Sequence, residues 1–360
     1  MPRKKNVSLK RLARLFVGVV FLLCILGVFW VFEASIAESY QLLGDPYHFV
    51  KQHVLGVGVG LCAFVVAALL PTRVWLTLGN YAWVGGLLLL LLVFVPGIGV
   101  ELNGAKRWIA LGGVVFQPVE LYKLSLIIFL ASWLTKHQRL GPFLLSLSVS
   151  IVIIILQPDL GSLLMVLGIA CGMYFLAGGK LLHFVGVGAV LLAVVAGLIA
   201  TSPYRMERVR TFFNPESNPS DSSFHIRQIT IALGRGGWVG QGVGNSKQRF
   251  SYIPEASTDS IFAIIAEEVG FLGSILMMLL LFSYTILGFR IASAHDEPAV
   301  QLLGYGIVLW VGMQMILNLS AIVALVPLTG IPLPFISYGR SALVMVLFSS
   351  GIILRIASES

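Results

Sequence analysis

The sequence predicts an all-α polytopic membrane protein, with about ten transmembrane helices in a single domain over residues 1–360. Composition is the first reason, because 58% of the residues are apolar and only 11% carry a formal charge. Soluble domains need about 25% charged residues to cover a surface that faces water. Length is the second reason, since the apolar residues fall in blocks of roughly 17 to 25, enough for a helix to cross a bilayer. A β-barrel would need alternation, which Leu87–Val95 lacks.

The first apolar block follows six basic residues that lie between Arg3 and Arg14. No clear cleavage pattern of small residues follows it, so we interpret it as a retained helix rather than a signal peptide. Pro118 is expected in the first turn of the fourth span, where a missing N–H costs nothing. The predicted spans are Leu15–Phe32, Phe49–Leu70, Leu78–Val95, Val119–Leu134, Pro142–Leu156, Leu160–Ala177, Leu181–Ala200, Ser260–Phe289, Val300–Leu325 and Arg340–Ala357.

The distribution of Lys and Arg predicts the topology. With the N-terminus inside, 12 of these residues lie inside and five outside, once the seven in the long connection are discounted. Both termini are therefore expected in the cytoplasm, with residues 201–259 as one large extracytoplasmic loop, more loop than domain. The net charge of +8 is interpreted as a topology signal and a contact for anionic lipid, not as a nucleic-acid surface.

Charged groups in or beside the spans are the candidate site residues, because each is costly in hydrocarbon. Glu120 and Lys123 lie three residues apart on one helix face, where they form either a structural pair or part of a substrate path. Lys106, Arg107 and Trp108 lie in an outside loop and fit a lipid diphosphate. An interfacial anchor is the alternative for these three.

Asp159 opens the sixth span, where capping of the helix is the simpler interpretation. Glu267 and Glu268 lie at least about 12 Å along the helix axis from Asp259, too far for an acid and base pair. The glycine-rich run 234–244 lacks the residue spacing of the nucleotide-binding motifs, and we expect it to wrap closely around a sugar or a helix.

Asp259 stands where the long outer loop meets the eighth span. Capping of that helix is one interpretation. The other is that the carboxylate takes a proton from a sugar hydroxyl brought to the outer face by a lipid anchor.

Five segments of the chain stand out together: Asn103–Ile109, Phe116–Lys123, Gln157–Ser162, Tyr252–Ala263 with Glu267 and Glu268, and Pro332–Gly339. In this order they resemble the SEDS family, named for shape, elongation, division and sporulation. The resemblance runs over most of the chain.

This resemblance implies a ten-helix membrane glycosyltransferase that polymerises lipid II into glycan strands on the outer face of the membrane. It implies that Asp259 is the family's essential aspartate and that a class B penicillin-binding protein is the partner. It ties Lys106, Arg107, Glu120, Lys123, Asp159 and Glu268 to the site less firmly. Gly244–Gln248 resembles the division branch, which implies other division proteins as partners and a septal place in the cytoplasmic (inner) membrane. A rod-elongation polymerase or a lipid II flippase is the alternative.

Two positions depart from the family pattern. Ser260 stands where the family usually has Phe, and Arg340 stands within a usual Gly-Gly-Ser-Ser run. Arg340 places a cation at the outer end of the last span, so we add it to the candidate diphosphate contacts. The resemblance requires no nucleotide cofactor. A divalent cation such as Mg²⁺ or Mn²⁺ would assist departure of a diphosphate, but its ligands are not evident from the sequence.

Overall fold

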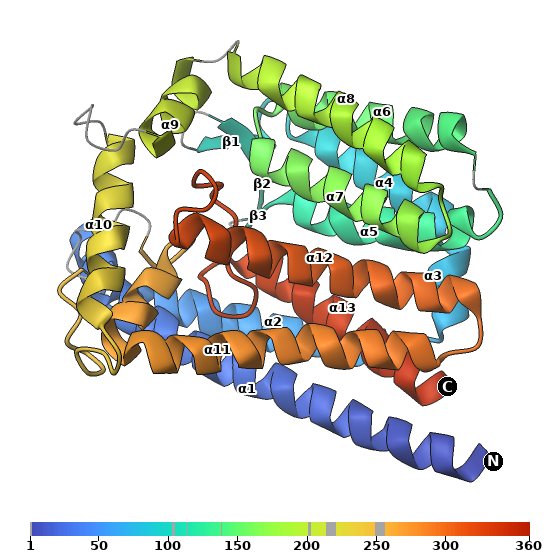
Figure 1. The fold of residues 1–360 in the computed structure, drawn as a ribbon, viewed down its shortest axis with the longest axis horizontal. Coiled ribbons are helices and arrows are strands. Elements are labelled where there is room, and N and C mark those ends of the chain that lie inside the picture. Colours follow the sequence, from blue (N-terminus) through green and yellow to red (C-terminus); the bar gives the residue numbers. More distant parts are fainter. Residues whose placement is uncertain are drawn as a thin grey trace.

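A computed structural model describes residues 2–102, 105–112, 114–137, 139–200, 203–213, 221–248 and 256–360. Most of the described chain is helical, and the helices run roughly along one long axis (Figure 1). The helices are α1 (Pro2–Leu43), α2 (His48–Leu69), α3 (Thr72–Thr77), α4 (Gly79–Leu92), α5 (Pro118–Leu134), α6 (Leu140–Leu156), α7 (Leu160–Leu176), α8 (Leu181–Ala200), α9 (Pro203–Phe213), α10 (Asp221–Gly236), α11 (Ile261–Ala294), α12 (Pro298–Ile322) and α13 (Arg340–Glu359).

A helix coincides with each of the ten predicted spans. Among the described residues, five helices are long and apolar enough to cross a membrane: α1, α2, α11, α12 and α13. Hydrocarbon offers no hydrogen-bond partners to the backbone, and a helix satisfies its backbone groups internally. Apolar runs of this length therefore fold as helices. Pro118 begins α5 as expected, and Pro298 begins α12 in the same way.

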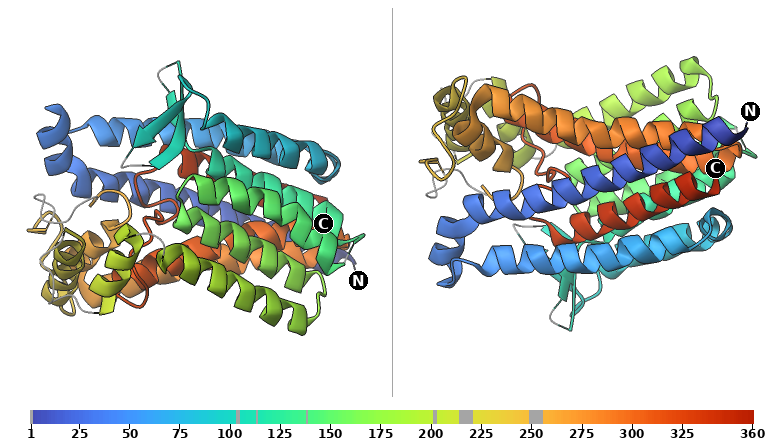
Figure 2. Two further views of the ribbon diagram at one scale, coloured as in Figure 1. Left: turned by 90° about the horizontal axis from the view of Figure 1, so that it is seen from above. Right: turned by 90° about the horizontal axis from the view of Figure 1, so that it is seen from below.

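Two segments differ from what the sequence predicts. Three short segments form a small antiparallel sheet, β1 (Gly99–Leu102), β2 (Ala105–Leu111) and β3 (Val114–Phe116), in the order β1-β2-β3. Its register pairs Val100 with Trp108 and Ile109 with Phe116, and the sheet projects from the side of the bundle (Figure 2). The interval 201–259, predicted to be mostly loop, contains the helices α9 and α10.

The two chain ends lie at one end of the bundle, whereas α9 and α10 lie at the other (Figure 1). Helix α5 is the most enclosed element, because 14 of its 17 residues are buried. It packs against α4, α7, α12 and α13. The polar groups that α5 carries are therefore held inside protein rather than in lipid.

Close packing of α2 on α13 depends on small residues. A Cβ at Gly56 would lie 3.4 Å from Arg340 Cγ, and a Cβ at Gly60 would collide with Leu347. Gly58 faces open space. Gly56 and Gly60 are therefore helix-packing positions, as is usual for small residues between membrane helices.

Candidate functional site

Asp259 lies in a turn at the end of the bundle opposite the chain termini, directly before α11. The residue is 9% exposed. Ser260 occupies the N-cap position of α11, so Asp259 precedes the cap rather than forming it. This arrangement disfavours the capping interpretation and leaves a nearly buried carboxylate at the start of α11.

The backbone of Asp259 is fixed by Asn318 of α12. The Asn318 side-chain amide donates to the Asp259 carbonyl at 2.7 Å and to the Ile331 carbonyl at 2.8 Å. One buried side chain therefore joins the turn before α11 to the loop between α12 and α13. Sequence reasoning missed this residue, although a polar amide inside an apolar span is the kind of costly group that signals a role.

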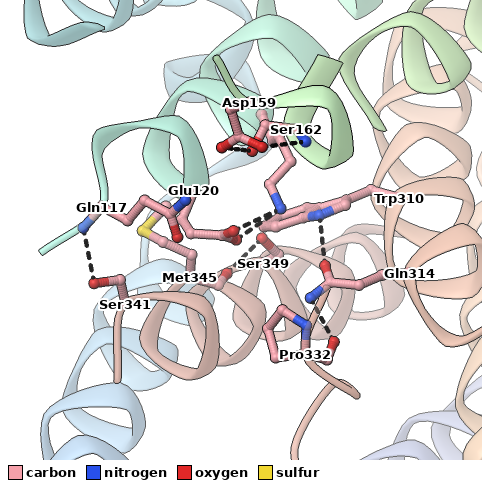
Figure 3. Close-up of polar contacts among 11 residues, drawn as sticks. Gln117, Glu120, Asp159, Ser162, Trp310, Gln314, Pro332, Ser341, Met345 and Ser349 are labelled. Carbon is pink, nitrogen blue, oxygen red and sulfur yellow. Dashed lines mark hydrogen bonds and ion pairs between the residues drawn. The ribbon is translucent and has the colours of Figure 1, made fainter. Parts of the chain in front are cut away.

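Gln314 repeats this arrangement one turn earlier on α12. Its amide nitrogen donates to the Pro332 carbonyl at 3.0 Å, and its oxygen accepts from the Trp310 indole at 3.1 Å (Figure 3). Trp310, Gln314 and Asn318 are four residues apart and so share one helix face. Together they hold the buried loop that contains Ile331 and Pro332.

The Glu120–Lys123 pair lies on α5 beside this face (Figure 3). The ammonium lies 2.9 Å from one Glu120 oxygen and 2.8 Å from the other, and both side chains are at most 5% exposed. Lys123 Nζ also lies 5.0 Å from the centre of the Trp310 ring. The pair is thus closed on itself and enclosed by protein, in the first turns of α5 rather than at its middle.

Asp159 caps α7. Its two carboxylate oxygens accept from the Ser162 backbone N–H at 3.0 Å and from the Ser162 hydroxyl at 2.7 Å (Figure 3). Arg107 donates to the carbonyls of Gln157 and Pro158 and lies 3.8 Å from Asp159. Both residues therefore stabilise the turn before α7.

Lys106 and Trp108 lie with Arg107 on β2 instead of in an irregular loop. Lys106 is exposed, Trp108 is half-buried, and Glu101 of β1 stands opposite Lys106. Asn103 and Gly104 lie outside the described residues. An exposed cation on a rigid strand remains available to an anionic ligand, whereas Arg107 is partly engaged by the protein.

Arg340 begins α13 and contacts α2. Its guanidinium donates to the Gln52 side chain at 2.7 Å, and the next residue, Ser341, accepts from the Gln117 backbone N–H at 3.1 Å. Burial raises the pKa of the adjacent Tyr338 phenol, which therefore stays neutral. The start of α13 is thus tied to both α2 and α5.

Glu267 and Glu268 organise the glycine-rich segment. Glu267 accepts from the Ser246 hydroxyl at 2.5 Å, and Glu268 accepts from the Gly244 backbone N–H at 3.0 Å. Both side chains are at most 1% exposed. The glycine-rich segment therefore wraps a helix, which was one of the two expectations for it.

A surface carboxylate on the same end of the bundle provides a contrast with Asp259. Asp45 pairs with Lys51 at 2.8 Å, and the hydrogen bond from Lys51 lowers the pKa of Asp45. Pairs this exposed contribute little to stability.

Within the described part of the chain, no three His, Cys, Asp or Glu side chains gather closely enough to hold a metal ion. Asp259 is contacted by the Ser260 hydroxyl and, at its backbone carbonyl, by the Asn318 amide. No step of the reaction is assigned to a divalent cation.

A bundle of helices long and apolar enough to cross a membrane, with a nearly buried carboxylate at one end, has the features of a multi-pass membrane protein with a site at the end of the bundle. The family profile described as "Cell cycle protein", FTSW_RODA_SPOVE, matches residues 13–360. The chain belongs to this family, the SEDS family.

Curated relatives match along nearly the whole chain. A probable peptidoglycan glycosyltransferase FtsW of Coxiella burnetii is 38% identical, with 100% of each chain covered. Stage V sporulation protein E of Bacillus subtilis is 35% identical, covering 96% of this chain and 97% of that protein.

Solved structures share the fold. One, described as "Structural coordination of polymerization and crosslinking by a peptidoglycan synthase complex", has a TM-score of 0.78 and 28% identity, covering 96% of this chain and 97% of that one. The rod shape determining protein RodA of Thermus thermophilus has a TM-score of 0.70 and 26% identity, with 96% of each chain covered.

Proposed function

We propose that this protein is a peptidoglycan glycosyltransferase that polymerises lipid II into glycan strands on the outer face of the cytoplasmic membrane. The full-length similarity to proteins named as probable peptidoglycan glycosyltransferases supports the activity. The observation that carries the proposal is Asp259, a nearly buried carboxylate whose backbone is fixed by Asn318 where the outer segment meets α11.

Asp259 is the general base in this mechanism. It accepts the proton of the sugar 4-hydroxyl on the incoming lipid II as that oxygen attacks the anomeric carbon of the growing strand, and undecaprenyl diphosphate leaves. A base must be held in place to act on one hydroxyl, because proton transfer depends on hydrogen-bond geometry. The Asn318 contacts supply such placement for the backbone.

Cations at the same end of the bundle balance the diphosphate charge. Lys106 is exposed on β2, which suits a charged headgroup that arrives from the membrane surface. Arg107 and Arg340 offer guanidinium groups that the protein already orients. Glu120, Lys123, Asp159 and Glu268 act by stabilising the fold around the site, because each is buried or hydrogen-bonded within the protein.

The proposed setting is the division septum, with both termini in the cytoplasm and ten spans. Relatives named FtsW, from several bacteria, favour the division branch over rod elongation. Similarity to a peptidoglycan synthase complex that coordinates polymerisation and crosslinking favours a transpeptidase partner, a class B penicillin-binding protein. Other division proteins would join this assembly.

A lipid II flippase would instead use ionisable groups that face one another at the middle of the membrane. The Glu120–Lys123 pair lies in the first turns of α5 and is closed on itself. A cavity of about 200 Å³, lined in part by Thr135 and Tyr305, lies where α5 ends and α12 begins, away from the Glu120–Lys123 pair in the first turns of α5. These observations favour the enzyme.

Replacing Asp259 by Asn tests the proposal. Asparagine keeps the shape of the side chain but accepts no proton, so polymerisation of labelled lipid II should fall by about 10²- to 10⁴-fold. Thermal stability should stay near that of the parent. Asp45→Asn is the matched control, because Asp45 is an exposed carboxylate on the same end, and it should leave the rate unchanged. Polymer yields near the parent value from Asp259→Asn would remove Asp259 as the base.

A further inference from the structure

Ser260, the residue after Asp259, contacts both Asp259 and the helix α10. Its hydroxyl oxygen lies 3.3 Å from Asp259 Oδ1 and 2.8 Å from His225 Nε2. Ser260 is fully buried, and His225 is half-buried on α10. A phenylalanine at position 260 has no group that could make either hydrogen bond.

The chemistry of the three groups fixes the direction of the hydrogen bonds. A carboxylate only accepts, so the single hydroxyl proton of Ser260 goes to Asp259. The Ser260 oxygen then accepts from His225, which must carry a proton on Nε2. The hydrogen bonds therefore run from His225 through Ser260 to one carboxylate oxygen of Asp259.

We propose that Ser260 and His225 are positioning residues, and that their hydrogen-bonded chain sets the orientation of the Asp259 carboxylate from α10. This inference rests on the proposed function of Asp259 as the base. Asn318 holds the backbone of Asp259, and the chain from α10 holds one carboxylate oxygen. The placement of the base therefore depends on α10 docking against α11.

The packing of α10 explains how this helix can stay docked while its hydrogen bond to Ser260 is lost. Ile229 and Ala232 of α10 are buried, and α10 packs on α11. At the last residue of α10, Gly236 comes so close to the Ala266 carbonyl that a Cβ would collide with it. The apolar contacts hold α10 in place, so the His225 hydrogen bond is not needed for docking. Loss of that bond should therefore affect the base more than the fold.

The test uses the full chain, reconstituted with a class B penicillin-binding protein, and measures kcat and KM for lipid II together with Tm. The variants are Ser260→Ala, His225→Phe and their combination. Each single change should lower kcat by about tenfold, since each removes a hydrogen bond that bears on a charged group. KM and Tm should stay close to the parent values.

Because the residues act in series, the double variant should be no slower than the slower single variant. His225→Gln, which keeps a donor of similar reach, should retain most of the parent kcat. Ser274→Ala is the matched control, since Ser274 is a buried serine of α11 that donates only to the Gly270 carbonyl of its own helix. Its kcat should equal that of the parent.

Several results would overturn the inference. A folded His225→Phe variant with parental kcat would do so, and this variant carries the test if Ser260→Ala does not fold. Multiplied losses in the double variant, or a His225→Gln variant as slow as His225→Phe, would also do so. If Asp259→Asn is inactive while these variants are normal, only this inference fails. If Asp259→Asn is active, the proposed base fails first.

Discussion

Buried charges in this protein are matched at the level of single side chains. Glu120 and Lys123 neutralise each other within one turn of α5, and Trp310 lies against the ammonium. Removing one partner would strand the other in a low-dielectric interior. Removing both would leave neither member of the pair as an unpaired buried charge.

Glu120→Gln and Lys123→Met should therefore each destabilise the protein by about 3–5 kcal/mol, because each leaves an unpaired buried charge. The double variant should recover most of that stability. Thermal unfolding in detergent measures both effects. Lys136→Met, at the exposed end of the same helix segment, should change stability by less than about 0.5 kcal/mol.

A double variant no more stable than the single variants would contradict this account of the pair. Its activity carries separate information. If the folded double variant makes no polymer, the pair has a role in the reaction in addition to its structural one.

Arg340 has both a polar contact and a packing contact with α2. Its guanidinium binds Gln52, and its side-chain stem covers Gly56. If it also contacts diphosphate, Arg340→Gln should weaken lipid II binding by about 1–3 kcal/mol, the range for one hydrogen bond between charged groups. The loss should shrink as salt rises, because ions screen exposed charges. Unchanged affinity at low salt would assign Arg340 to packing alone.

Among the secondary-structure elements, α11 contains a break that only particular residues can form. Gly270 has φ of +66°, inside a helix of 34 residues. The interrupted backbone is satisfied by the glycine-rich segment: Gln241 N–H donates to the Glu267 carbonyl, Gly242 N–H donates to the Glu268 carbonyl, and both distances are 3.0 Å. Gly240 and Gly270 face each other backbone to backbone, so neither has room for a side chain.

Gly270→Ala should accordingly destabilise the protein by at least about 2 kcal/mol, since it adds a left-handed backbone penalty to a collision with Gly240. Gly234→Ala is the control, because Gly234 is helical in α10 and nothing lies near its missing Cβ. That change should be neutral or stabilising by up to about 1 kcal/mol. Equal melting temperatures for the two variants would contradict the role assigned to the break.

For the whole molecule, the two termini and the helices α9 and α10 lie at opposite ends of the bundle (Figure 1). Single cysteines in a version lacking Cys24, Cys62 and Cys171 test which end faces out. Thr230→Cys, exposed on α10, should react with an impermeant thiol reagent in intact cells. Ser293→Cys, near the end of α11, should react only after lysis. The reverse pattern would invert the topology and move Asp259 to the cytoplasmic side.

The sequence by itself determined where the ten long apolar helices lie. Apolar runs in lipid must satisfy their own backbone, so length and hydropathy suffice to place a helix at each predicted span, and Pro118 and Arg340 mark helix starts correctly. Local chemistry also singled out Asp259, since a carboxylate at the border of an apolar span is costly and rarely idle. The cap at Asp159 likewise depends only on neighbours in sequence.

The tertiary structure decided which residues contact one another across the fold. The contact of Asn318 with Asp259 joins residues 59 positions apart, and that of Arg340 with Gln52 joins residues 288 positions apart. No local pattern selects such pairs, because they follow from how whole helices pack. Residues 99–116 became a sheet rather than a loop for a similar reason: short strands are stabilised by cross-strand pairing and not by intrinsic preference. The chain from His225 to Asp259 exists only because α10 folds back onto α11.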